Sequence, residues 1–326
     1  MLRASSFLTP EEIRAFGIRS NLIGALLVLH AWAVIAAAMV FFVLWPNLLS
    51  LVIAVMIIGG RQLGLAILMH DAAHGLLFTR KSTNDWVGQW LCAYPVITDL
   101  LIYRPYHLKH HRFTQQPDDP DLVLSAPFPV TRASLRRKII RDLTGQVGYA
   151  RRKAQLLDAL GPSWLCWRGR VGEFREKLGG AALVNVILFA GLAAIGYWWL
   201  YPLLWLLPLL TWYQLASRIR NIAEHAVVPD NDDPMRNTRT TLAGPLTRLL
   251  IAPYWVNYHL EHHLLPFAPC WRLKAVHDFM LARGYGQYME VRRSYREVLA
   301  LAASALVDPD FDPEDEPPRP GAAQHI

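Results

Sequence analysis

The sequence predicts an all-α integral membrane protein, with four transmembrane helices in two hairpins and a cytoplasmic helical cap that carries three histidine clusters. Two observations support this fold class. The chain of 326 residues is 53% hydrophobic with a mean hydropathy of +0.19, and several of its apolar runs approach the roughly 20 residues that a bilayer span requires. The histidine clusters, in turn, all follow or precede these runs on one side of the expected membrane.

The apolar runs form two pairs. The first pair covers about 21–45 and 48–69 and is divided at Pro46, where a turn suits proline. The second pair covers about 181–199 and 201–217 and is divided near Pro202. Because the second pair is short for two perpendicular spans, one of its helices is expected to be tilted or kinked. Four membrane spans follow from this pattern.

The basic residues predict the orientation of these spans. The segment 104–177 between the two hairpins contains 15 Lys and Arg residues, whereas the turns at Pro46 and Pro202 carry no charge. Cytoplasmic loops of membrane proteins are enriched in Lys and Arg, so this segment should face the cytoplasm. With four spans, both termini and all three histidine clusters then lie on the cytoplasmic face. Because this orientation depends only on hydropathy and basic residues, the common location of the histidine clusters supports it independently.

One domain, 1–306, is expected to hold the whole fold, and the acidic, proline-rich segment 307–326 reads as a disordered tail. The net charge of +7 and the isoelectric point near 9.4 come largely from residues next to the predicted spans. Attraction to anionic lipid head groups explains these residues better than nucleic-acid binding does, since no nucleic-acid motif accompanies them. Membrane lipids are therefore expected partners, and nucleic acids are not.

The histidine clusters are HDAAH at 70–74, HLKHH at 107–111 and HLEHH at 259–263, which together hold eight of the twelve histidines. On a helix, side chains three and four positions apart share one face, so each cluster is expected to form a convergent half-site. Eight imidazoles exceed the three or four ligands of a zinc ion, which implies two metal ions. Imidazole suits zinc, copper, iron and nickel alike, so the ligand type alone leaves the metal open. Three widely spaced cysteines indicate neither a disulfide framework nor a thiolate site.

The ordered boxes HDAAH, HLKHH and NYHLEHHLLP around two apolar hairpins resemble the membrane fatty acid desaturase family, from about Arg61 to His277. In that family a further histidine, preceded four residues earlier by an asparagine, completes a non-haem di-iron site, and RNIAEH at 220–225 matches this pattern. The resemblance thus implies two Fe ions, with Asn221 reaching a metal through water. The implied histidine ligands are His70, His74, His107, His110, His111, His225, His259, His262 and His263.

Several other residues near the boxes are candidates for supporting roles. Carboxylates inside the boxes can orient imidazole N–H groups, and a solvent-facing charge is the alternative interpretation for Asp71, Glu224 and Glu261. His277 is expected to support the ligands or to be structural. For the acidic residues after the second box, helix capping or a salt bridge is favoured over metal ligation: Asp118, Asp119 and Asp121.

The resemblance implies an O2-dependent acyl desaturase. In this sequence the first box, HDAAH, has three residues between its histidines, which favours a lipid-linked acyl substrate. No fused cytochrome b5-like domain is expected. An external electron donor such as ferredoxin or cytochrome b5 is therefore implied. A hydroxylase or ketolase of a lipid or carotenoid on the same scaffold is the nearest alternative. A membrane zinc hydrolase and a metal transporter or sensor are further alternatives. The first would act without O2 or reductant, and the second predicts polar residues throughout the spans.

Overall fold

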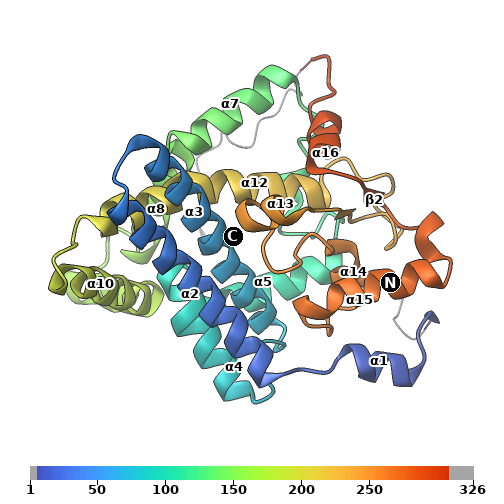
Figure 1. The fold of residues 1–326 in the computed structure, drawn as a ribbon, viewed down its shortest axis with the longest axis horizontal. Helices are drawn as coiled ribbons and strands as arrows, with labels where there is room; N and C mark the ends of the chain where they lie inside the picture. Colours follow the sequence, from blue (N-terminus) through green and yellow to red (C-terminus); the bar gives the residue numbers. More distant parts are fainter. Residues whose placement is uncertain (1–5, 308–326) are drawn as a thin grey trace.

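The computed structural model describes residues 6–307, and the fold over this range is mostly helical. The predicted tail at 307–326 lies outside the described residues apart from Val307. After a short N-terminal helix α1 (Pro10–Phe16), two long helices form a hairpin, α2 (Asn21–Leu44) and α3 (Leu48–Ala73). Their bounds agree with the predicted spans 21–45 and 48–69 to within a few residues. Figure 1 shows α2 running alongside α3.

Both helices of this hairpin start at polar caps and are long and apolar enough to cross a membrane. The Ser20 hydroxyl accepts a hydrogen bond from the Ile23 amide, and Asn47 forms a capping box with Ser50. The two helices differ in burial. The most apolar window of α3 is 67% buried inside the protein, against 28% for the stretch that contains α2. The helix α3 is therefore the central one, and most of α2 lies on the surface of the protein.

The predicted second hairpin is less regular. The helices α9 (Trp167–Lys177) and α10 (Gly179–Ala194) meet at a bend of 71° and qualify as a candidate span only as a pair. The expected span at 201–217 is not one helix, because it consists of a π-helix η4 (Tyr201–Leu206), a short α11 (Leu207–Leu210) and the first part of α12 (Trp212–His225). Pro202 and Pro208 lack the backbone N–H that a regular ladder needs, which accounts for this irregularity. Within residues 6–307, two or three helices are thus candidate spans.

The remaining elements lie between the two hairpins and after the second one. Between the hairpins lie α4 (Lys81–Val87), the π-helix η2 (Gly88–Ala93), η3 (Tyr94–Val96), α5 (Leu100–Phe113), α6 (Leu122–Ser125), α7 (Arg132–Leu143) and α8 (Gln146–Ala159). After α12 come β1 (Thr240–Thr241), α13 (Pro245–Leu250), α14 (His259–Leu264), η5 (Cys270–Arg272), α15 (Leu273–Ala282), η6 (Tyr285–Gln287), β2 (Val291–Arg292) and α16 (Tyr295–Ala302).

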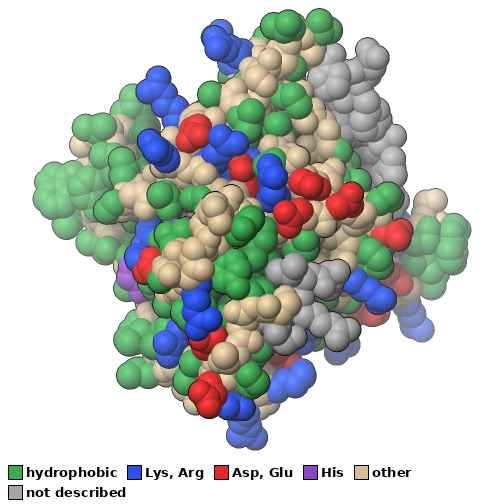
Figure 2. Space-filling view, turned by 90° about the vertical axis from the view of Figure 1, so that its right-hand side faces the viewer, with side chains coloured by type: hydrophobic (Ala, Val, Ile, Leu, Met, Phe, Trp, Pro, Cys, Tyr) green, Lys and Arg blue, Asp and Glu red, His purple; other side chains and the backbone are tan. Residues whose placement is uncertain are grey.

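The all-α prediction missed one feature, a two-stranded parallel sheet in which Thr240 pairs with Val291 and Thr241 with Arg292. Strands of two residues leave no periodic signal in the sequence. The face of the molecule that includes α15, β2 and α16 has Lys, Arg, Asp and Glu side chains spread across it (Figure 2). This part of the chain therefore presents a polar surface, unlike α2.

The packing of α2 depends on Gly24. A Cβ at this position would lie only 2.1 Å from the Leu77 carbonyl oxygen, so the helix touches the segment after α3 through bare backbone. We expect Gly24→Ala to lower the free energy of unfolding by about 1–3 kcal/mol, because the helix must move away from this segment. Denaturant titration of the detergent-solubilised protein measures this quantity.

Gly191→Ala is the matched control, because residue 191 also lies in an apolar helix but a Cβ there meets nothing within 4 Å. Its free energy of unfolding should stay within about 1 kcal/mol of the wild type or increase. An equal decrease in the free energy of unfolding of both variants would contradict the close approach of Gly24 to Leu77.

Candidate metal centre

Four helices carry histidines whose ring nitrogens lie together near the C-terminal end of α3. Figure 1 shows how these helices are arranged. The helix α3 supplies His70 in its last turn and His74 as its C-terminal cap. The helix α12 ends on His225. The helices α5 and α14 supply the HLKHH and HLEHH clusters. Segments nearly 200 residues apart in the sequence are thus joined, as the sequence predicts.

All nine predicted histidines belong to two groups in which the potential ligand atoms lie within 4.8 Å of one another. Five form one group, and four form the other. In the described part of the chain both groups consist of imidazoles alone, in agreement with an all-nitrogen donor set. The five-histidine group is His70, His74, His107, His111 and His262, and the four-histidine group is His110, His225, His259 and His263.

The prediction that each cluster forms one convergent half-site holds for HDAAH, whose histidines both belong to the five-histidine group, but it is wrong for HLKHH and HLEHH. His107 and His111 belong to the five-histidine group, but His110 between them belongs to the other. In the same way, His262 is separated from its neighbour His263. Adjacent helical residues project about 100° apart, whereas residues four apart differ by only about 40°. Each HxxHH cluster therefore contributes to both groups.

The ring nitrogens within each group face one another. In the five-histidine group, the Nε2 atom of His107 lies 2.8 Å from that of His74 and 2.9 Å from that of His111. In the four-histidine group, the Nε2 atom of His259 lies 2.8 Å from that of His225 and 3.0 Å from that of His263. Burial, reinforced by the neighbouring histidines, lowers the pKa of His107, His111, His262 and His263 well below its usual value. Neutral imidazoles with converging lone pairs suit bound cations, so the residues fit two metal ions.

The two groups are in direct contact. The rings of His111 and His263, one from each group, stack with their centroids 4.2 Å apart and an interplanar angle of 20°. The ring centroids of His259 and His262, again one from each group, lie 5.6 Å apart. Metal ions held by the two groups would therefore be close neighbours.

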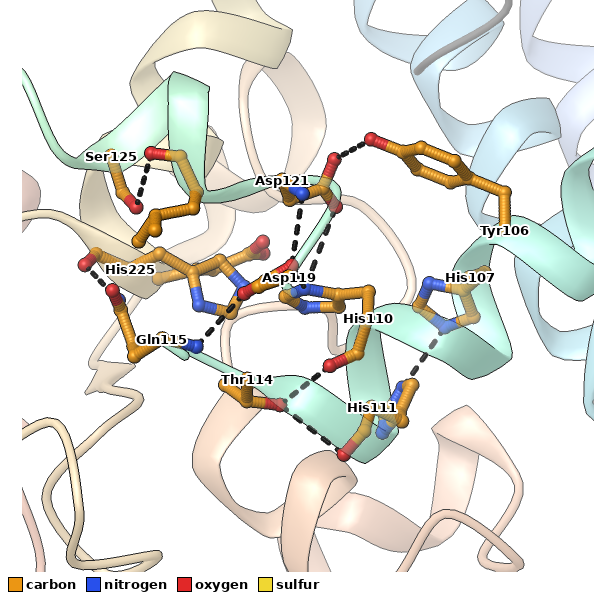
Figure 3. A network of polar contacts seen from close by, with 12 residues as sticks. Tyr106, His107, His110, His111, Thr114, Gln115, Asp119, Asp121, Ser125 and His225 are labelled. Atoms are coloured by element: carbon orange, nitrogen blue, oxygen red, sulfur yellow. Dashed lines mark hydrogen bonds and ion pairs between the residues drawn. The ribbon is translucent and has the colours of Figure 1, made fainter. Parts of the chain in front are cut away.

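A polar network after α5 supports the four-histidine group (Figure 3). The Asp119 carboxylate accepts a hydrogen bond of 2.8 Å from Nδ1 of His110 and another of 2.8 Å from the backbone N–H of Gln115. The Gln115 side chain donates to the His225 carbonyl at 2.6 Å. Such an outer bond fixes the orientation of a metal-binding imidazole. The sequence analysis favoured a cap or a salt bridge for Asp119, and the structure gives it an ionic partner in His110, which the sequence did not identify.

Two of the predicted supporting residues lie around the same group. The Glu224 carboxylate accepts two bonds of 2.7 Å from Nε of Arg220 and lies 3.6 Å from Nε2 of His259. The Asn221 side chain lines a cavity together with three imidazoles of the four-histidine group. This placement agrees with the role that the resemblance implies for Asn221, and its contact through water stays a prediction.

The other predicted supporting residues contact protein groups beyond the ligands. Glu261 is fully buried and lies 2.6 Å from Nδ1 of His277. Asp71 accepts a hydrogen bond of 3.0 Å from the Cys270 amide and so ties α3 to the segment after α14. These residues hold the elements that carry the nine histidines, whereas Asp119 contacts the imidazole of one of the nine, His110.

Comparison with known proteins places this centre in a family. The sequence model described as Fatty acid desaturase matches residues 45–295. The chain is 28% identical to dihydrorhizobitoxine desaturase of Bradyrhizobium elkanii, over 82% of this chain and 78% of that protein. It is also 28% identical to a beta-carotene ketolase of Paracoccus sp. (65% and 73% coverage) and 23% identical to a chloroplastic omega-6 fatty acid desaturase of Brassica napus (71% and 53%). Because the matched range spans most of the chain and contains all nine histidines, the chain belongs to the fatty acid desaturase family of oxidoreductases.

Proposed function

We propose that the protein is an O2-dependent desaturase that introduces a double bond into a lipid-linked acyl chain. The observation that carries this proposal is the pair of adjoining all-imidazole groups, five and four, in a chain with apolar helices long enough to span a membrane. Two iron ions held by these groups would supply the activation of O2. A buried, apolar C–H bond needs such an oxidant because it offers no polar handle for acid–base chemistry.

We further propose that a separate carrier, such as ferredoxin or cytochrome b5, supplies the electrons. Desaturation removes two hydrogens from the substrate, while reduction of O2 to two molecules of water takes four electrons. The substrate provides two of them, so a donor must provide the other two.

In the membrane, the proposed arrangement has four spans, with the active site and both termini on the cytoplasmic face. The second hairpin would consist of α10 and the irregular segment from η4 into α12. Support comes from the basic residues of α7 and α8 and from the polar surface of the part of the chain that follows the spans.

A ketolase or hydroxylase of a lipid or carotenoid is the second candidate, favoured by the similarity to beta-carotene ketolases. After removal of the first hydrogen, transfer of oxygen gives a hydroxyl group, and removal of a second hydrogen gives a double bond. The same centre therefore supports both outcomes. The similarity to dihydrorhizobitoxine desaturase adds dihydrorhizobitoxine to the substrates to be tested.

Expression in a host that lacks polyunsaturated lipids tests the proposal, with mass spectrometry of the extracted lipids as the readout. We expect a new product that is lighter than its precursor by two hydrogens, formed only when O2 and reductant are present. A product heavier by one oxygen would indicate a hydroxylase instead, and a product that has gained one oxygen and lost two hydrogens would indicate a ketolase. Turnover without O2 would refute both and indicate a hydrolase.

A further inference from the structure

A metal-binding histidine usually forms a hydrogen bond through the ring nitrogen that does not face the metal, and this outer bond orients the ring. Two imidazoles of the four-histidine group lack such a bond. His110 has such a partner in Asp119, and Nδ1 of His263 lies 3.2 Å from the Thr114 hydroxyl. The Nδ1 atoms of His225 and His259 are buried and have no hydrogen-bond partner among residues 6–307. The direction of these two rings must therefore be set through the backbones that carry them.

The backbone of His225 is held by Arg239, whose side chain is fully buried. The guanidinium donates to three carbonyls at the end of α12: Ala223 at 3.3 Å, Ala226 at 2.9 Å and Val227 at 2.8 Å. The Arg239 amide adds a bond of 2.9 Å to the carbonyl of Glu224. The last carbonyls of a helix have no partner within it, and its negative end attracts a cation, so this arginine caps the turn that ends at His225.

The cap also holds a backbone conformation that is unfavourable by itself. Val227 has a φ of 51°, a left-handed value that β-branched residues rarely adopt. Its carbonyl is one of the oxygens that Arg239 binds. The sharp exit from α12 directly after His225 is therefore stabilised by this side chain.

The backbone of His259 is held by the two residues that follow Arg239. The Thr241 amide donates to the Asn257 carbonyl at 3.0 Å, and the Asn257 side chain donates back to the Thr241 carbonyl at 3.1 Å. A β-bridge joins Thr240 to Tyr258, the residue before His259. Figure 1 shows the paired strand β2 between α16 and α14, where it keeps β1 in place.

We propose that residues 239–241 are the positioning segment of the four-histidine group. This one segment binds the backbone next to both imidazoles that lack an outer partner, while Gln115 binds the His225 carbonyl itself. The Nε2 atoms of the two imidazoles lie 2.8 Å apart. Arg239 is itself anchored, because its Nε donates to Glu290 at 3.0 Å. The inference rests on the proposed function, because that function requires two metal ions. A segment that contains no ligand would then determine how tightly the four-histidine group binds its metal ion.

The test compares Arg239→Gln with Arg292→Gln in the full-length protein. Arg292 donates to the same Glu290 carboxylate at 2.8 Å, but its side chain bonds only Glu290 and Glu297 within the described chain. Metal per chain is measured after equilibration with iron over a range of chelator concentrations, and Mössbauer spectra report the two iron environments. We expect two irons in the wild type and in Arg292→Gln. In Arg239→Gln, the iron of the four-histidine group should bind about 10- to 100-fold more weakly, while the five-histidine group stays filled.

Asn257→Ala provides a second, milder test, since it removes one bond on the His259 side and leaves Arg239 in place. It should weaken the same iron, with the same Mössbauer component lost. Two tightly bound irons in Arg239→Gln, or parallel loss of both irons in all three variants, would overturn the inference. A wild-type protein that never binds a second iron would instead refute the proposed function.

Discussion

His107→Ala should abolish oxidation of the substrate while the protein remains inserted in the membrane. His107 lies at the middle of the five-histidine group, where its Nε2 atom is within 3 Å of both His74 and His111. Alanine removes a ligand that no neighbouring side chain replaces, and both metals are needed for the proposed reaction. Product formation in isolated membranes, normalised to the amount of inserted protein, should fall to the background of membranes without the enzyme.

Lys109→Ala is the matched control, because Lys109 is an exposed residue of the same helix between His107 and His110. It should keep wild-type activity and iron content. The two variants together separate loss of a ligand from damage to α5. Wild-type turnover by His107→Ala would show that the five-histidine group is not part of the active centre.

Asp119→Asn should weaken metal binding by the four-histidine group about 10- to 100-fold, the usual effect of losing the outer partner of a ligand histidine. The carboxylate accepts bonds from Nδ1 of His110 on one oxygen and from the Gln115 amide on the other. An asparagine of the same shape has only one accepting oxygen, so its NH2 group must face a donor. Iron per chain, measured against chelator concentration, gives the change in affinity, and activity should fall with it.

Asp118→Asn provides the control, since Asp118 is the exposed neighbour of the buried Asp119. It removes the same charge from the same turn without touching His110. Equal iron affinity in the two variants would mean that the bond from Asp119 does not orient the imidazole.

The sequence singled out the nine histidines that the fold gathers because most of them are spaced locally, and their role as metal ligands stays a prediction. His70 and His74 lie one helical turn apart, and any helix brings such a pair together. The division between the two groups escaped prediction because it depends on how α5 and α14 face each other. The first hairpin followed from hydropathy, whereas the region 201–217 did not form the expected regular helix, since hydropathy does not register the backbone donors that Pro202 and Pro208 lack.

The supporting residues were harder to predict for a related reason. Asp119 lies in an irregular turn, and Arg239 acts on a helix end through contacts that only the folded chain creates. Neither residue belongs to a repeating pattern. Their roles follow from tertiary packing, which cannot be predicted from composition and periodicity.

Both histidine groups draw on the segment 259–263: His262 completes one, and His259 and His263 complete the other. Neither group can therefore assemble until the ribosome has made most of the polypeptide, well after the first hairpin has emerged. Under the proposed function, iron would then be delivered to a nearly finished chain whose first hairpin is already in the bilayer. A nascent protein truncated before residue 259 would carry six of the nine imidazoles and still lack a complete set for either ion.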